Sequence, residues 1–269
     1  MSSAELCTYE VSEGVATVAF NRPDHMNGMI GDMEVAYFET LLTAESDPAV
    51  RVIVVTGNGR AFCPGADLSY KASPGEEPLP NTVLERTTPL GIDKPMIAAI
   101  NGACAGVGLA YALQCDIRIA ARGIKMTTAF SRRGLIAEYG MAWLLNQIAG
   151  RAVALDLLMS ARVFTSDEAG ALGVVNQVVE RESFEAVVGA YAADLAANVS
   201  PASMATIKRQ VNAADGEDSI ESLIGAEKLM RESLDGPDVA EGIASFLERR
   251  PAQFSPLGHG TRYSWMDTA

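Results

Sequence analysis

The chain has few of the side chains that enzymes most often use for acid–base and metal chemistry. Among its 269 residues are two histidines, His25 and His259. A catalytic dyad built on histidine therefore has little support. The cysteines have no spacing typical of a metal site, and we expect them to be reduced and mostly buried in a cytoplasmic protein. They are Cys7, Cys63, Cys104 and Cys115.

Long apolar runs and excess positive charge are also missing. No uninterrupted apolar stretch is long enough to span a bilayer, and the first residues do not have the pattern of a signal peptide. The formal net charge is -13, which disfavours binding to nucleic acid or to an anionic membrane. We therefore expect neither as a partner, and an anionic ligand would need a local basic or backbone-dipole site.

The order of apolar patterns predicts an α/β core with a helical appendage. A hairpin is expected over residues 6–21, a helix over 31–46, and buried strands over 50–59, which ends in turn residues, 94–100 and 116–120. From Tyr139 onwards the patterns are mainly helical. One of these helices begins with a hydroxyl cap at Thr165, and another begins with Pro201. Strands alternating with helices and followed by helices alone indicate this architecture.

The stretch "NGACAGVGLAYALQCD", residues 101–116, places small residues between two of these strands. A helix that begins near Val107 or Gly108 would present free N–H groups where a ligand can approach closely. This arrangement suits a resident or developing negative charge. Close packing of a helix on a sheet also needs glycine and alanine, so both readings stay open for this stretch alone. The spacing fits neither a dinucleotide fingerprint nor a P-loop.

A second stretch, "TGNGRAFCPGADLS", residues 56–69, also follows a buried strand and contains a Gly-Ala-Asp step. Two such turns can direct two N–H groups at one oxygen. Donors placed this way on a thioester carbonyl would stabilise an enolate more than the starting ester, and so lower a barrier.

Together these motifs resemble the enoyl-CoA hydratase/isomerase (crotonase) superfamily. The resemblance rests on "AFCPGADL", "PMIAAINGACAGVGLAYALQCDIRIA", "FTSDEAGALGVVNQVV" and "EGIASFLERR", in this order. It implies a crotonase-like spiral of ββα units over residues 1–198, and a C-terminal helical region for trimerisation over 199–269. It also implies a homotrimer or a dimer of trimers.

The resemblance implies an acyl-CoA thioester ligand, with coenzyme A as part of the substrate and with no bound cofactor or metal. By motif match, the N–H groups of Ala66 and Val107 would be the two oxyanion donors. The segment of Ala66, Asp67, Leu68 and Ser69 would lie along the pantetheine and adenine. The turn around Arg22 would lie near the nucleotide.

The chain departs from its relatives where a typical hydratase carries two glutamates. Ala110 and Phe130 stand at these positions, and neither can transfer a proton. Glu138 remains as the candidate acid and base, or as a nucleophile. Its alternative reading is a capping or surface carboxylate at the start of a helix. The loop from Tyr70 to Arg86 holds further acids that could reach the site.

These observations predict an enzyme that acts on an acyl-CoA thioester through an enolate, with Glu138 as its sole acid and base. Isomerisation of a double bond fits one acid better than standard hydration does. Two alternatives stay open. One is a thioester hydrolase or dehalogenase that uses Glu138, and the other is an acyl-CoA-binding homologue without catalysis.

Overall fold

The larger of two sheets begins with the predicted hairpin and continues with parallel strands. The computed structural model describes residues 3–69, 86–214, 216 and 218–267. The strand order is β1-β2-β3-β5-β7-β10; β1 and β2 pair antiparallel, and each later pair is parallel. The strands are β1 Cys7–Ser12, β2 Val15–Phe20, β3 Val52–Gly57, β5 Met96–Ile100, β7 Ile117–Ala121 and β10 Gln177–Val179. The hairpin and the buried strands expected from the sequence are therefore confirmed.

A smaller sheet runs beside one end of the first, in the order β4-β6-β8-β9. Its strands β4, β6 and β8 pair in parallel, and each follows a strand of the larger sheet in the sequence. Because the chain passes from β5 to β6 before α4 and from β7 to β8 before α5, it forms the spiral of ββα units that the family resemblance implied. The short strands themselves were not predicted. They are β4 Ala61–Cys63, β6 Ala103–Ala105, β8 Lys125–Thr127 and β9 Phe164–Thr165.

The helices follow the apolar patterns closely. The Thr165 hydroxyl accepts a hydrogen bond from the N–H of Glu168 at 3.3 Å, as expected of a cap. Gly150 has a φ of 79° and breaks the longest helix into two parts. No helix of the described residues is long and apolar enough to cross a membrane. The helices are α1 Ser3–Leu6, α2 Gly31–Ser46, α4 Val107–Gln114, α5 Met141–Ser160, α6 Ser166–Ala171, α7 Phe184–Asn198, α8 Pro201–Ala213, α9 Ser219–Leu234 and α10 Pro237–Glu248.

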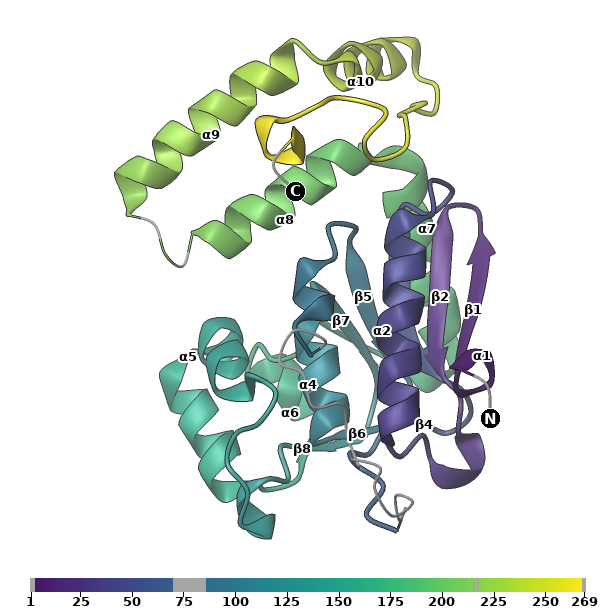
Figure 1. The fold of residues 1–269 in the computed structure, drawn as a ribbon, viewed down its shortest axis with the longest axis vertical. Coiled ribbons are helices and arrows are strands. Elements are labelled where there is room, and N and C mark those ends of the chain that lie inside the picture. Colours follow the sequence, from purple (N-terminus) through teal and green to yellow (C-terminus); the bar gives the residue numbers. More distant parts are fainter. Residues whose placement is uncertain (1–2, 70–85, 215, 217, 268–269) are drawn as a thin grey trace.

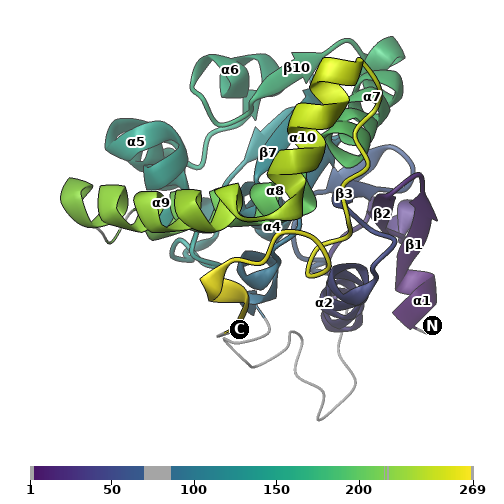
Figure 2. The same ribbon diagram turned by 90° about the horizontal axis from the view of Figure 1, so that it is seen from above.

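The larger sheet is covered on both faces. Helices α2 and α7 lie on opposite sides of it, as Figure 2 shows, and α4 packs against β4, β5, β6 and α5. Helices α8, α9 and α10 lie beyond the other end of the sheet (Figure 1). The division of the chain at residue 198 falls where α7 ends, and it stays a prediction.

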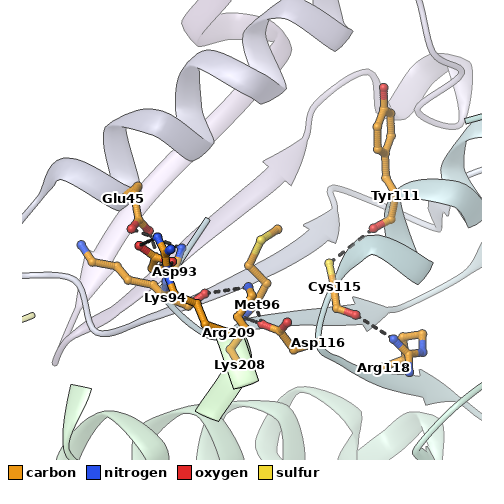
Figure 3. A network of polar contacts seen from close by, with 10 residues as sticks. All are labelled: Glu45, Asp93, Lys94, Met96, Tyr111, Cys115, Asp116, Arg118, Lys208 and Arg209. Atoms are coloured by element: carbon orange, nitrogen blue, oxygen red, sulfur yellow. Dashed lines mark hydrogen bonds and ion pairs between the residues drawn. The ribbon is translucent and has the colours of Figure 1, made fainter. Parts of the chain in front are cut away.

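Ion pairs fasten the first of the C-terminal helices to the core (Figure 3). The Lys208 ammonium lies 2.8 Å from the Asp116 carboxylate, which also accepts from the N–H of Met96 at 2.7 Å. Arg209 donates two hydrogen bonds to Asp93, at 2.7 and 2.8 Å. Because a bidentate pair fixes orientation as well as distance, the second half of α8 is held in a set direction against the loops that precede β5 and β7.

Gly108 provides a direct test of how α4 packs on the smaller sheet. A Cβ atom at this position would lie 2.2 Å from the carbonyl oxygen of Cys63, whereas at Gly189 in α7 it would meet nothing within 4 Å. We expect Gly108→Ala to destabilise the fold by about 1–3 kcal/mol through overpacking. Gly189→Ala should be neutral or slightly stabilising because alanine favours helices. Thermal unfolding of both variants measures the difference, and equal stabilities would contradict the packing described here.

Candidate active site

The first candidate donor lies in the turn after β4. Gly65 has a φ of 111°, a conformation that favours glycine. The N–H of Met29 donates to the Gly65 carbonyl, and the N–H of Asp67 donates to the Met29 carbonyl, both at 2.8 Å. Ala66 forms a parallel bridge with Met29 between these two bonds. Because alternate peptide groups of a strand point to opposite sides, the N–H of Ala66 points away from Met29.

The second candidate donor begins α4. Gly106 has a φ of 50° and its N–H donates to the Thr127 carbonyl at 3.1 Å. Val107 is the first residue of the helix, so its N–H has no acceptor in the preceding turn of helix. In the part of the chain that the structure describes, the N–H groups of Ala66 and Val107 have no hydrogen-bond acceptor. Within the described part of the chain, both N–H groups are therefore available to a ligand.

The two turns touch through their glycines. A Cβ atom on Gly65 would lie 3.3 Å from the Ala105 carbonyl oxygen, and one on Gly106 would lie 3.6 Å from the Gly65 Cα. The strands that lead into the turns, β4 and β6, pair in parallel. The predicted donors therefore follow two backbone segments so close that one added Cβ atom would reach from one to the other. This closeness is what a shared oxyanion site requires.

The side chains of Arg22 and Ser69 hold the first turn in place through Asp67. Arg22 donates to the Gly28 carbonyl and forms an ion pair of 3.1 Å with Asp67. The hydroxyl and the N–H of Ser69 donate to the other Asp67 oxygen at 2.6 and 3.1 Å, and these bonds, with Arg22, hold the pKa of Asp67 below its usual value. The Arg22 charge is therefore paired with a carboxylate of the protein itself. Leu68 is 77% exposed and can contact a ligand.

Glu138 lies in the loop between β8 and α5 and is half-buried. Its carbonyl accepts from the N–H of Met141 at 3.0 Å. Two left-handed residues follow it, Tyr139 with a φ of 55° and Gly140 with a φ of 69°. The Tyr139 ring contacts the Tyr111 ring of α4 edge-on, with centroids 5.8 Å apart. The loop that carries Glu138 is thus attached to the helix that begins with Val107.

The residues at the two altered positions are apolar and buried. Ala110 is fully buried within α4, and Phe130 precedes the short turn at Ser131–Arg133. Neither side chain can bind or release a proton near the donors. The acids of the loop from Tyr70, Glu76, Glu77 and Glu85 among them, lie outside the described residues.

Cys63, three residues before Ala66, is not a nucleophile. Burial raises the pKa of Cys63 to about 12, so its thiolate is scarce at neutral pH. All four cysteines are free and buried, as the sequence led us to expect.

The structure adds one acid that sequence reasoning missed. Glu34 is fully buried in the first turn of α2, where the Tyr111 hydroxyl donates to its carboxylate. The sequence does contain a signal for this buried acid. Glu34 shares a helical spacing with Tyr37, Phe38 and Leu41, all buried, and an acid within such a stripe requires a polar partner.

Comparison with known proteins agrees with this arrangement. The sequence profile of the enoyl-CoA hydratase/isomerase family matches residues 10–256. The 1,2-epoxyphenylacetyl-CoA isomerase of Escherichia coli is 33% identical over 262 residues, which cover 93% of this chain and 98% of that protein. A protein of Rhodobacter capsulatus named "Probable enoyl-CoA hydratase" is 34% identical, with 92% and 96% covered.

A solved structure gives the same result for the fold. The crystal structure of a probable enoyl-CoA hydratase/isomerase from Mycobacterium abscessus superposes with a TM-score of 0.84 at 29% identity, covering 96% of this chain and 100% of the other. The match in profile, sequence and fold extends over nearly the whole chain. The chain therefore belongs to the enoyl-CoA hydratase/isomerase family, within the crotonase superfamily of acyl-CoA enzymes.

Proposed function

We propose that the protein binds an acyl-CoA thioester and stabilises its enolate with the N–H groups of Ala66 and Val107. The observation that carries the proposal is the contact between Gly65 and Gly106, which brings two turns with unoccupied N–H groups together. Negative charge on the thioester oxygen grows when a proton leaves the neighbouring carbon. Donors fixed before that step stabilise the charge without reorganising, and each is worth about 10²–10³ in rate.

Glu138 moves the proton in this proposal. Its carboxylate takes a proton from C2 of a 3-enoyl thioester, and the electrons of that C–H bond form the enolate. The same carboxyl group then returns the proton to C4, so the double bond moves from C3–C4 to C2–C3. The proton count balances, and one acid–base group is sufficient.

Isomerisation suits this set of residues better than standard hydration. Hydration of the usual family type activates a water molecule between two carboxylates, and Ala110 and Phe130 supply neither. Kinship does not settle the reaction, because one relative is named a 1,2-epoxyphenylacetyl-CoA isomerase and another a probable enoyl-CoA hydratase, and neither name describes a double-bond isomerase. The chemistry of the site is therefore the deciding argument.

The ligand brings its own cofactor group in this proposal. Coenzyme A enters as part of the thioester, and no resident cofactor or metal takes part. In this proposal the exposed Leu68 and Ser69 contact the pantetheine, and Arg22 holds the turn through its ion pair with Asp67. We place the reaction in the cytoplasm, which suits four cysteines that are all free.

Replacement of Glu138 tests its role. We expect Glu138→Gln to lower kcat for 3-enoyl-CoA isomerisation by about 10²–10⁴, because the amide cannot accept the proton. Affinity for the CoA ester should change little. The assay follows the absorbance of the conjugated thioester with short, medium and branched substrates. Glu185→Gln, at an exposed acid at the start of α7, is the matched control.

Other outcomes would contradict the proposal in distinct ways. Unchanged rates in Glu138→Gln would remove this residue from the reaction. A covalent adduct found by intact mass in the wild type would indicate a nucleophile, as in a thioester hydrolase or a dehalogenase. Binding of CoA esters without turnover of any of them would indicate a binding protein that has lost catalysis.

We also propose that the C-terminal helices join the chain into a homotrimer or a dimer of trimers. Helix α10 exposes Ile243, Phe246 and Leu247, the last two by 80% and 72%. A groove of about 670 Å³ lies between α8 and the core, and it is lined by Trp143, Ile207 and Val211 among others. Apolar surface of this extent favours burial against other copies. Sedimentation should give a trimer or hexamer, and a monomer at micromolar concentration would contradict this proposal.

A further inference from the structure

Glu34 is a buried carboxylate with no place in the reaction described above. Its side chain is fully buried, and the Tyr111 hydroxyl donates a hydrogen bond to its Oε1. Removing a carboxylate from water costs several kcal/mol unless the protein supplies partners. A chain that keeps such a group between α2 and α4 is expected to use it.

Tyr111 donates to this carboxylate, and Tyr139 packs on the Tyr111 ring. Burial, and next the charge of Glu34, raise the pKa of Tyr111 and also that of Tyr139. Both phenols therefore stay protonated and able to donate at neutral pH. The two rings contact each other edge-on, and the Arg86 guanidinium lies 5.1 Å from the centre of the Tyr139 ring. Glu34, Tyr111 and Tyr139 thus form a line of contacts from α2 to the loop of Glu138.

The segments around Glu34 are those that carry the candidate reacting groups. Tyr111 lies one helical turn after Val107 in α4. Tyr139 follows Glu138 directly. The Glu34 charge also contributes to raising the pKa of Cys63, which lies in β4 just before the turn of Ala66. Through Tyr111 and Tyr139, this carboxylate is therefore joined to the helix of Val107 and to the loop of Glu138.

We propose that Glu34 is a positioning residue, which sets the place of the Glu138 carboxylate relative to the N–H groups of Ala66 and Val107 through Tyr111 and Tyr139. Glu34 does not touch the substrate, and no bond to it forms or breaks. The inference rests on the proposed function, because Glu138 must be the group that moves the proton. A misplacement of about 1 Å can cost about 10²-fold in rate.

The backbone of the Glu138 loop gives a reason for such support. Tyr139 is a non-glycine residue in the left-handed region, which costs about 1 kcal/mol or more and persists only when its surroundings hold it. The contacts of its ring with Tyr111 and Arg86 are the holding contacts, and Glu34 acts on them through its hydrogen bond with Tyr111. Loss of Glu34 should loosen this loop before it loosens the rest of the fold.

Glu34→Gln tests the proposal, with Glu39→Gln as the control on the exposed face of the same helix. We expect the first variant to lower kcat for the CoA ester about tenfold or more and to leave KM within about twofold. The control should match the wild type. In the absence of any ligand, amide hydrogen exchange over residues 134–141 should be faster in Glu34→Gln alone, with little change in β3 and β5.

The exchange measurement separates this proposal from the proposed function. If the wild type turns over no CoA ester, the proposed reaction fails, and faster exchange over residues 134–141 still supports the contact role of Glu34. Unchanged exchange in Glu34→Gln overturns the proposal whatever the activity, and so does unchanged kcat in an active enzyme.

Tyr111→Phe keeps the carboxylate and the ring but removes the hydroxyl that donates to Glu34, so it serves if Glu34→Gln does not fold. It should lower kcat and speed exchange over residues 134–141 in the same direction. If both variants fold, the kcat of the double variant should be little lower than that of the more impaired single variant, because the two groups act together. Additive losses would overturn the proposal.

Discussion

The contact between the backbones of Gly65 and Gly106 is the constraint on which the candidate site depends. It exists because β4 and β6 pair in parallel and because both turns use a glycine with positive φ. Gly108 continues the same requirement into α4, where a Cβ atom would strike the Cys63 carbonyl. The small residues of the 101–116 stretch therefore serve both readings that the sequence left open. They allow close packing, and that packing is what brings the two N–H groups together.

Buried and half-buried charges fix the segments around this contact. Arg22 and Asp67 hold the first turn, Glu34 lies beneath α4 and the loop of Glu138, and Lys208 ties α8 to Asp116. Each of these groups is paired or hydrogen-bonded, as burial of charge requires. The arrangement leaves the donors themselves as backbone atoms on rigid elements, while the one proposed proton carrier sits on a loop. This division explains why we expect changes near the loop to alter kcat more than binding.

Much of the fold could be predicted from the sequence, because long elements carry their own signals. The helix over 31–46, the cap at Thr165 and the buried strand at 52–57 all follow from local pattern. The strands β4, β6 and β8 could not be predicted in this way. Each has three residues, too few to show alternation, and each exists only because its neighbour pairs with it.

Less of the site than of the fold could be predicted from the sequence. Ala66 and Val107 were identified by motif match and not by pattern, because a backbone N–H leaves no mark on residue type. Glu34 was missed because its spacing reads as part of an apolar stripe and its tyrosine partner lies far away in sequence, in α4. The assignment of Ala66, Val107 and Glu138 to the reaction stays a prediction. Ala110 and Phe130 limit which reactions are reasonable.

The most direct measurement of the central claim is the infrared spectrum of a bound thioester. A saturated acyl-CoA, labelled with ¹³C at the thioester carbonyl, binds without reacting and reports the hydrogen bonds to that oxygen. If the N–H groups of Ala66 and Val107 both donate to it, the carbonyl stretch should move to a clearly lower frequency than in water, because two fixed donors polarise the bond more than solvent does. A bound ester whose carbonyl frequency equals its value in water would contradict the account.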